Sequence, residues 1–136
     1  MANFEWTSGI EIGYPEIDEQ HKLLFVLAQA VADPLVSAAD HKPDMEKLQV
    51  LIDFSQEHFA FEENLMRSSG YPETERHAKY HVALLTELQT YCARLGRGVN
   101  TDRASLVDFL RNWLLLHIDT ADRELAVWLK KREILA

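Results

Sequence analysis

Residues 58–81 read HFAFEENLMRSSGYPETERHAKYH, and this stretch decides the fold class. His58 and Glu62 stand four residues apart, and so do His77 and His81. Four residues advance an α-helix by roughly 400°, so the two side chains of each pair leave the same face about one turn apart. A glycine and a proline between the pairs are typical of a helix end followed by a helix start. The stretch therefore predicts two neighbouring helices, each presenting a pair of metal-binding side chains.

Helical periodicity continues on both sides of this stretch. Asp18 is suited to cap the start of the first helix, and Gly70 to end the second. Helices of this length with short connections favour an up-down-up-down four-helix bundle, an all-α fold in one domain over residues 1–136. The expected elements are an N-terminal arm over 1–16, helices over about 18–36, 43–69, 72–95 and 102–120, and a short C-terminal helical tail over 122–134.

Composition excludes several classes of protein. The net charge of -8 argues against nucleic acid and anionic membranes as main partners, because both need a basic surface. The single cysteine, Cys92, cannot form an internal disulfide or a cysteine-based metal site. The N-terminal residues lack the basic start and the apolar run of a signal peptide. No apolar run in the sequence is long enough to span a bilayer. We expect a cytoplasmic protein that does not span the membrane, with no protein partner indicated.

Five of the six histidines fall inside the expected helices, and only His41 lies in a loop, where we expect it to be solvated. A single histidine on an apolar helix face is usually an ordinary core residue, and a His/Glu pair is usually a surface pair. Five imidazoles and a carboxylate buried together would cost on the order of several kcal/mol in desolvation. That is a large part of a net stability of about 5–15 kcal/mol. A metal centre removes this cost, because the side chains become ligands.

The residues alone leave the metal open between iron, zinc and copper. One zinc ion takes four ligands, so five histidines with carboxylates exceed a single zinc site. A zinc metalloprotease helix would carry a glutamate where Ala78 stands between His77 and His81, which argues against that class of enzyme. The ligand set therefore implies two metal ions.

Several motifs follow one another along the chain: IDEQHK at 17–22, HFAFEE at 58–63, GYP at 70–72, HAKYH at 77–81 and WLLLHIDTAD at 113–122. In this order they resemble the hemerythrin family, over a span from Trp6 to about Asp122, with loops like those of its single-domain bacterial members. The resemblance implies a protein that holds two non-heme iron ions joined by an oxo or hydroxo bridge. It also implies that molecular oxygen is bound reversibly as a hydroperoxide, for storage, transport or delivery. No catalytic residue is implied.

The resemblance also implies a role for each ligand position. One iron would be bound by three histidines and the other by two, with two carboxylates bridging both, which leaves one coordination position open on the two-histidine iron. The three histidines are His77, His81 and His117, the two are His21 and His58, and the bridges are Glu62 and Asp122. The pocket for oxygen would be lined by Leu24, Phe59, Trp113, Leu114 and Ile118.

Asp122 is the ligand that helical spacing does not support. It follows His117 by five residues, which leaves the two side chains about 140° apart on an ideal helix, whereas Glu124 would lie nearly in line with His117. The family motif nevertheless has its aspartate at Asp122. Choosing Asp122 predicts a local break or one wide turn in the fourth helix between these residues.

Three other functions compete with oxygen carriage. Hemerythrin-like domains are similar to the input modules of signalling proteins, so an oxygen, iron or redox sensor is one alternative. A diiron oxidase, peroxidase or nitric oxide-handling enzyme is another, and iron storage or delivery is a third. Ferritin-like oxidases are richer in carboxylates than this histidine-rich set, which favours binding over catalysis.

Overall fold

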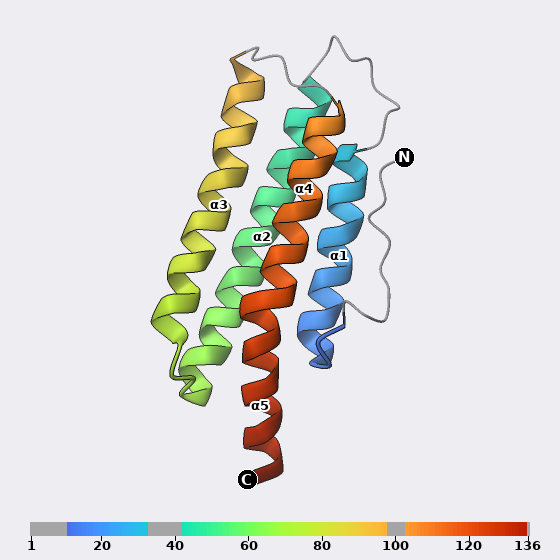
Figure 1. Ribbon diagram of the computed structural model, residues 1–136. Coiled ribbons are helices and arrows are strands. Elements are labelled where there is room, and N and C mark those ends of the chain that lie inside the picture. Colours follow the sequence, from blue (N-terminus) through green and yellow to red (C-terminus); the bar gives the residue numbers. More distant parts are fainter. Residues whose placement is uncertain (1–10, 33–41, 98–102, 136) are drawn as a thin grey trace.

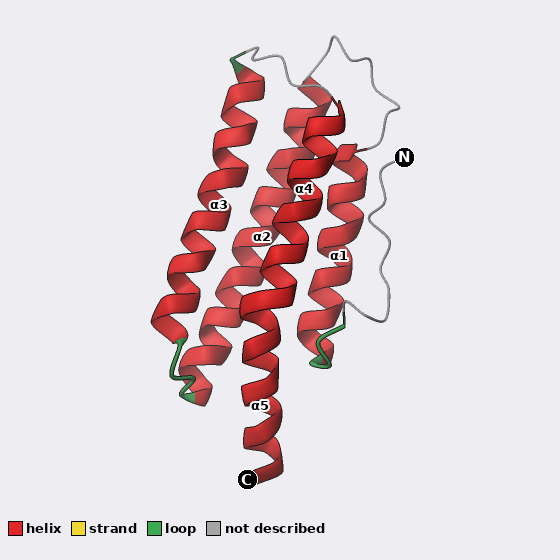
Figure 2. Ribbon diagram, viewed as in Figure 1, coloured by secondary structure: helices red, strands yellow, loops and turns green. Residues whose placement is uncertain are grey.

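The computed structural model describes residues 11–32, 42–97 and 103–135 of the 136-residue chain. Within these ranges the only regular elements are helices (Figure 2). They are α1 (Pro15–Ala32), α2 (Lys42–Ser69), α3 (Thr74–Gly96), α4 (Arg103–His117), a π-helix (Ile118–Asp122) and α5 (Arg123–Leu135).

The helices form one bundle with alternating chain direction (Figure 1). α2 packs against both α1 and α3, and α1 contacts α4. α4, the π-helix and α5 continue one another as a single long rod, and the end of α5 projects beyond the neighbouring helices (Figure 1). The all-α, up-down-up-down bundle expected from the sequence is confirmed.

The core lies along the axis of the bundle and is built from apolar stripes on every helix. Leu24 on α1, Leu51 on α2, Leu88 on α3 and Leu110 on α4 are all almost fully buried. α5 adds Leu125 to the same cluster. Among the described residues, Asp18 and Ser55 are two of the polar side chains buried in this core. The other buried polar side chains lie together at one level of the bundle, and they are the histidines and carboxylates discussed below.

The end of α2 follows the sequence prediction at Gly70. This glycine has a positive φ of 74°, which a residue without a side chain adopts at little cost. The backbone N–H of Tyr71 donates to the carbonyl of Met66, and that of Gly70 donates to the carbonyl of Arg67. This pair of hydrogen bonds satisfies carbonyls at the helix end and turns the chain back towards α3.

Two predicted helix starts are wrong by two or three residues. α1 begins at Pro15, because proline suits the first helical position and the N–H of Asp18 already bonds to the carbonyl of Tyr14. Asp18 is therefore inside the helix and does not cap it. α3 begins at Thr74, since the preceding residues form a turn in which the Thr74 N–H and hydroxyl both bond to the Tyr71 carbonyl.

Asp18 instead holds the chain that enters α1. Its carboxylate accepts hydrogen bonds from the backbone N–H groups of Ile12 and Gly13, at 2.9 and 3.0 Å. Gly13 has a φ of +85°, which strains any residue with a side chain, and it lies beside the flexible end of Lys130 on α5. Of the arm predicted over 1–16, residues 11–14 are held against the start of α1 by these bonds, and residues 15 and 16 already belong to α1. Residues 1–10, including Trp6, lie outside the described residues.

The helix predicted over 102–120 ends as an α-helix at His117, because the π-helix Ile118–Asp122 follows it. The remaining predicted boundaries that can be compared lie within one residue of those observed. The stretch 33–36, expected at the end of the first helix, lies outside the described residues, as does the loop that holds His41. None of the helices in the described ranges combines the length and apolar content needed to cross a membrane.

Asp18→Ala tests how the entry to α1 is held. The substitution leaves two backbone N–H groups without their acceptor, and the Ile12 N–H is buried, so we expect a loss of about 1–3 kcal/mol in the free energy of unfolding. Chemical denaturation of the metal-free protein measures it. Glu16→Ala, at an exposed position in the same turn, is the control and should change stability by less than about 0.5 kcal/mol. Equal effects of the two substitutions would contradict this role of Asp18.

Candidate metal centre

Six predicted ligands meet in the interior of the bundle from four separate elements. α1 supplies His21, α2 supplies His58 and Glu62, α3 supplies His77 and His81, and the π-helix supplies Asp122. All six are buried, with no more than 3% of any of them exposed. The helical pairs on α2 and α3 point inwards together, as their four-residue spacing predicts.

One oxygen of each carboxylate faces the pair formed by His21 and His58. Oδ2 of Asp122 lies 2.7 Å from Nε2 of His21 and 3.8 Å from Nε2 of His58. Oε2 of Glu62 lies 3.1 Å from Nε2 of His58 and 3.8 Å from Nε2 of His21. Both imidazoles thus direct the same type of nitrogen at the same two oxygens.

The other oxygen of each carboxylate faces the pair formed by His77 and His81. Oε1 of Glu62 lies 3.2 Å from Nε2 of His77 and 2.9 Å from Nε2 of His81. Oδ1 of Asp122 lies 3.0 Å from Nε2 of His77. Glu62 and Asp122 therefore stand between two histidine pairs, and each carboxylate gives one oxygen to each pair.

These distances fit a pair of metal ions. Adjacent ligands of an ion with bonds of roughly 2.0–2.2 Å lie about 3 Å apart when they subtend a right angle. The structure contains two overlapping groups of this kind, one with His21 and His58 and one with His77 and His81, and both include Glu62 and Asp122. Nε2 of His77 and Oε2 of Glu62 are buried, and their close contacts within the centre do not have hydrogen-bonding geometry, as expected of ligand atoms directed at an ion. The donor set therefore fits two metal ions with shared carboxylates.

The π-helix explains how Asp122 reaches this centre. Residues Ile118–Asp122 form a wide turn with an extra residue, which rotates Asp122 inwards relative to an ideal helix. The wide turn predicted from the choice of Asp122 is confirmed. Glu124, the alternative in an ideal helix, is 57% exposed and forms an ion pair with Arg76 on α3 at 2.8 Å. The seventh predicted ligand, His117, ends α4, and its side chain lies outside the described residues.

Two outer residues, which the sequence reasoning did not identify, orient the imidazoles. Nδ1–H of His58 donates to Oε1 of Gln20 on α1 at 2.6 Å, and Nδ1–H of His81 donates to Oε2 of Glu63 on α2 at 3.0 Å. Such bonds fix which ring nitrogen faces a metal. The only feature of the sequence that could have identified them is that each is adjacent to a predicted ligand, Gln20 to His21 and Glu63 to Glu62.

The electrostatics of the metal-free centre favour charged imidazoles. Burial opposes the charge of His58, but the Glu62 and Asp122 carboxylates outweigh it and raise the pKa of His58 to about 10. The same balance of burial against Asp122 and Glu62 raises the pKa of His77 to about 9. Burial and the nearby Asp122 charge would raise the pKa of Glu62, but His58 and His77 outweigh them and hold it well below its ordinary value. In the absence of metal, protonated His58 and His77 thus offset the negative charge of the carboxylates, as bound metal ions would.

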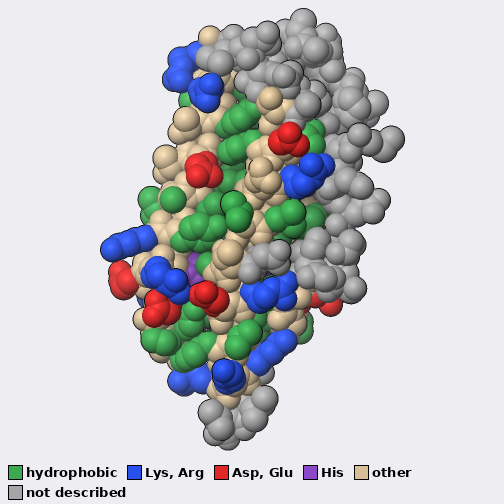
Figure 3. All heavy atoms as spheres, in the orientation of Figure 1, with side chains coloured by type: hydrophobic (Ala, Val, Ile, Leu, Met, Phe, Trp, Pro, Cys, Tyr) green, Lys and Arg blue, Asp and Glu red, His purple; other side chains and the backbone are tan. Residues whose placement is uncertain are grey.

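An apolar wall surrounds the centre. The Phe59 ring stacks on the His81 ring, with centroids 4.1 Å apart and planes at 8°. The Trp113 indole N–H donates to the Leu84 carbonyl, so its only polar atom is satisfied. On the face shown in Figure 3, only a small patch of histidine surface is visible between the surrounding side chains. All five residues predicted to line an oxygen pocket are buried in the core: Leu24, Phe59, Trp113, Leu114 and Ile118.

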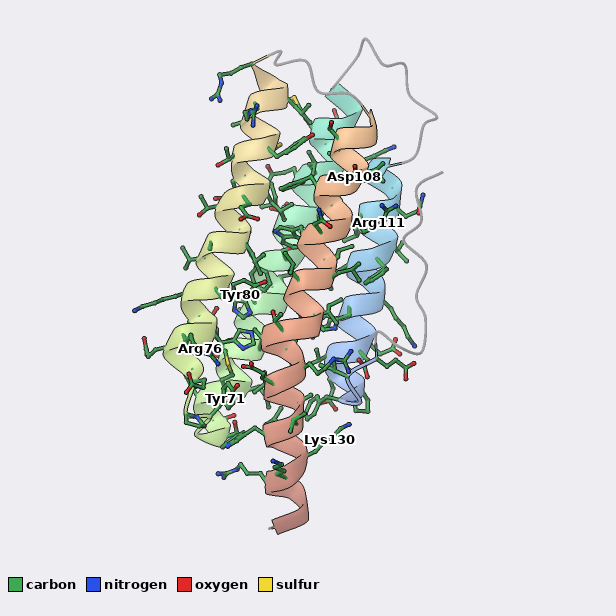
Figure 4. The ribbon with its side chains drawn as sticks, in the orientation of Figure 1. Tyr71, Arg76, Tyr80, Asp108, Arg111 and Lys130 are labelled. Carbon is green, nitrogen blue, oxygen red and sulfur yellow. The ribbon has the colours of Figure 1, made fainter. Side chains whose placement is uncertain are left out.

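One cavity of about 190 Å³ borders the centre beside the π-helix. Tyr71, Arg76 and Tyr80 lie together on this side of the bundle, between α3 and the lower part of the long rod (Figure 4). His77 belongs to its lining, and the Arg76–Glu124 ion pair stands at the same cavity. The cavity therefore reaches His77 from the outer side of the His77/His81 pair.

Comparison with known proteins agrees with this geometry. Residues 12–129 match the family model described as the hemerythrin HHE cation binding domain. This chain belongs to the hemerythrin family. It is 30% identical to a bacteriohemerythrin of Pseudomonas paraeruginosa, over 90% of this chain and 78% of the relative. It is 34% identical to the myohemerythrin of Sipunculus nudus, over 88% of both chains.

Solved structures support the fold of this hemerythrin-family chain. A crystal structure of a hemerythrin variant superposes with a TM-score of 0.81 and covers 93% of this chain and 96% of its own. The two sequences are 24% identical, so this likeness concerns the fold alone. The bundle and the family predicted from the sequence motifs are both confirmed.

Removal of metal should make stability depend on pH. Because folding raises the pKa of His58 from 6.5 to about 10, the stabilisation from its charge is complete below pH 6.5 and is lost as the pH rises to about 10. The depressed pKa of Glu62 acts in the opposite direction, with stability lost on acidification below its ordinary value of 4.5. The free energy of unfolding of the metal-free protein, measured in urea from pH 3 to 10, should therefore be highest between about pH 4.5 and 6.5. A midpoint that stays constant from pH 6.5 to 10 would contradict charged imidazoles in the core.

Proposed function

We propose that this protein binds two iron ions at the centre formed by Glu62 and Asp122, and that it binds molecular oxygen there reversibly, without catalysing a net reaction. The observation that carries the proposal is the division of carboxylate oxygens, in which each carboxylate serves both histidine pairs. A protein with two separate metal sites would not need shared carboxylates. Membership of the hemerythrin family, with relatives named bacteriohemerythrin and myohemerythrin, supports the same function.

In this proposal, His21 and His58 hold one ion. His77, His81 and His117 hold the other, and Glu62 and Asp122 bridge them. Imidazole and carboxylate ligands suit iron. When bound, the iron pair would supply two electrons for reversible oxygen binding, and the unequal number of histidines would leave a coordination position open on the side of His21 and His58. Storage, transport or delivery of oxygen are the roles that such reversible binding serves.

The chain's own contribution is to exclude water and acids from the bound ligand. Leu24, Trp113 and Ile118 present apolar surface from α1, α4 and the π-helix, and each is almost completely buried. Phe59 covers one face of His81, and its ring lies 5.7 Å from that of His58. A dry pocket preserves a reversible complex, because water would assist loss of reduced oxygen and leave the iron oxidised.

Iron content and optical spectra test the proposal. Purified protein reconstituted anaerobically should hold two irons per chain. A spectrum recorded on the reduced protein should change on aeration and return on removal of oxygen. One iron per chain, or irreversible oxidation on the first aeration, would contradict reversible binding. Continuous consumption of oxygen, peroxide or nitric oxide would favour an enzyme instead.

The ligand assignment can be tested with Asp122→Ala and Glu124→Ala. Loss of a residue that only supports a metal ligand costs about 10- to 100-fold in metal affinity, so loss of a bridging carboxylate should cost at least as much. Asp122→Ala should therefore lose at least one iron on gel filtration with a weak chelator. Glu124→Ala removes only an exposed ion pair, worth about 0–1 kcal/mol, and should retain both. The reverse pattern would identify Glu124 as the ligand.

Leu114→Ala tests the apolar pocket. The smaller side chain opens space that water can enter, and we expect autoxidation of the oxygenated protein to become several-fold faster. Leu106→Ala, elsewhere on α4, is a matched control because the same side chain is lost from the core. Each substitution should cost about 2–5 kcal/mol in stability. Autoxidation that is unchanged in Leu114→Ala, or accelerated equally in both variants, would contradict the assignment of Leu114 to the pocket.

A further inference from the structure

The two metal positions differ in the group that supports one of their histidines. His58, of the first pair, donates its Nδ1 proton to the neutral side-chain amide of Gln20 at 2.6 Å. His81, of the second pair, donates its Nδ1 proton to the carboxylate of Glu63 at 3.0 Å. In both cases Nε2 faces Glu62, at 3.1 and 2.9 Å, so the ring nitrogen that would bind metal is the same. The difference between these two supporting hydrogen bonds is therefore the charge of the acceptor.

A carboxylate behind an imidazole acts on a metal differently from an amide. It draws the Nδ1 proton towards itself and increases the electron density at Nε2, which makes the imidazole a stronger donor. A stronger donor stabilises the more highly charged ion of a redox pair. An amide oxygen fixes the orientation of the ring but carries no net charge, so its effect on the donor strength of His58 is smaller.

Glu63 is held in place for this role by contacts on both sides. Its other oxygen, Oε1, lies 3.3 Å from the guanidinium of Arg67, one helical turn further along α2. The side chain of Glu63 is only 23% exposed, whereas that of Arg67 is 60% exposed. The stacked ring of Phe59 restricts rotation of His81. The carboxylate is therefore aligned with His81 before any metal binds.

We propose that Glu63 is a positioning residue that adds to the electronic difference between the two iron positions, favouring ferric iron at the His77/His81 position through its hydrogen bond to His81. This inference rests on the proposed function, because it needs iron at the centre. The Gln20 amide leaves the His21/His58 position, where the open coordination site is expected, more readily reduced.

Glu63→Gln tests this inference in the iron-loaded protein. The substitution keeps the shape and an acceptor oxygen but removes the charge, so it reproduces at His81 the support that His58 has. We expect a tenfold or larger loss in preference for ferric over ferrous iron at one position. That corresponds to a rise of about 59 mV in one of the two one-electron midpoint potentials, measured by spectroelectrochemistry.

Two control variants separate this effect from others. Arg67→Gln breaks the surface ion pair but leaves the Glu63–His81 bond, and Glu87→Gln removes a negative charge from an exposed position on the helix that carries His81. Neither should raise a midpoint potential. Potentials in Glu63→Gln equal to those of the unsubstituted protein would overturn the inference, and so would an equal rise in Glu87→Gln.

The reciprocal variant, Gln20→Glu, keeps the inference testable if Glu63→Gln loses iron. It places a carboxylate behind His58, and we expect one midpoint potential to fall by a similar amount. Unchanged potentials in this variant would overturn the inference. Failure of the proposed function is recognised separately, because the unsubstituted protein would then fail to bind two irons or to show two reversible one-electron steps.

Discussion

Two buried carboxylates, Glu62 and Asp122, impose the constraint on which the rest of this structure depends. Neither has any exposed surface, and both lie at one level of an otherwise apolar bundle. Burial of an ionised carboxylate costs several kcal/mol even after relaxation, whereas a domain of this size has a net stability of about 5–15 kcal/mol. In the metal-free protein, His58 and His77 offset this charge, because the two carboxylates raise the pKa of both imidazoles. In the proposed function, metal ions take over this role.

The bundle meets this constraint by combining regular and irregular helix. Two helical turns, one on α2 and one on α3, bring three imidazoles and Glu62 inwards with no distortion. Asp122 requires a different solution, because a straight fourth helix would direct it away from His77. The π-helix provides that rotation and lets the same rod continue into α5, where Tyr71 packs against Trp128 and Glu124 pairs with Arg76. Local irregularity in one helix thus completes a centre that the other three helices leave open on one side.

The sequence predicted the helices and the inward pairs because both depend on spacing within one helix. His58 with Glu62, and His77 with His81, could be placed on common faces without knowing how the helices pack. Asp122 could be chosen over Glu124 only through the family motif, since a π-turn depends on packing around Ile118 that spacing does not encode. Gln20 and Glu63 were not recognised for a related reason. Their partners, His58 and His81, lie on other helices, and Asp18 was likewise misjudged because its partners lie in the preceding loop.

Anomalous diffraction from crystals of the iron-loaded protein tests the central claim most directly. We expect two iron peaks in each chain, one beside Nε2 of His21 and His58 and one beside Nε2 of His77 and His81. Glu62 and Asp122 should each bind one ion through one carboxylate oxygen and the second ion through the other oxygen. A single peak, or two peaks that do not share both carboxylates, would contradict it.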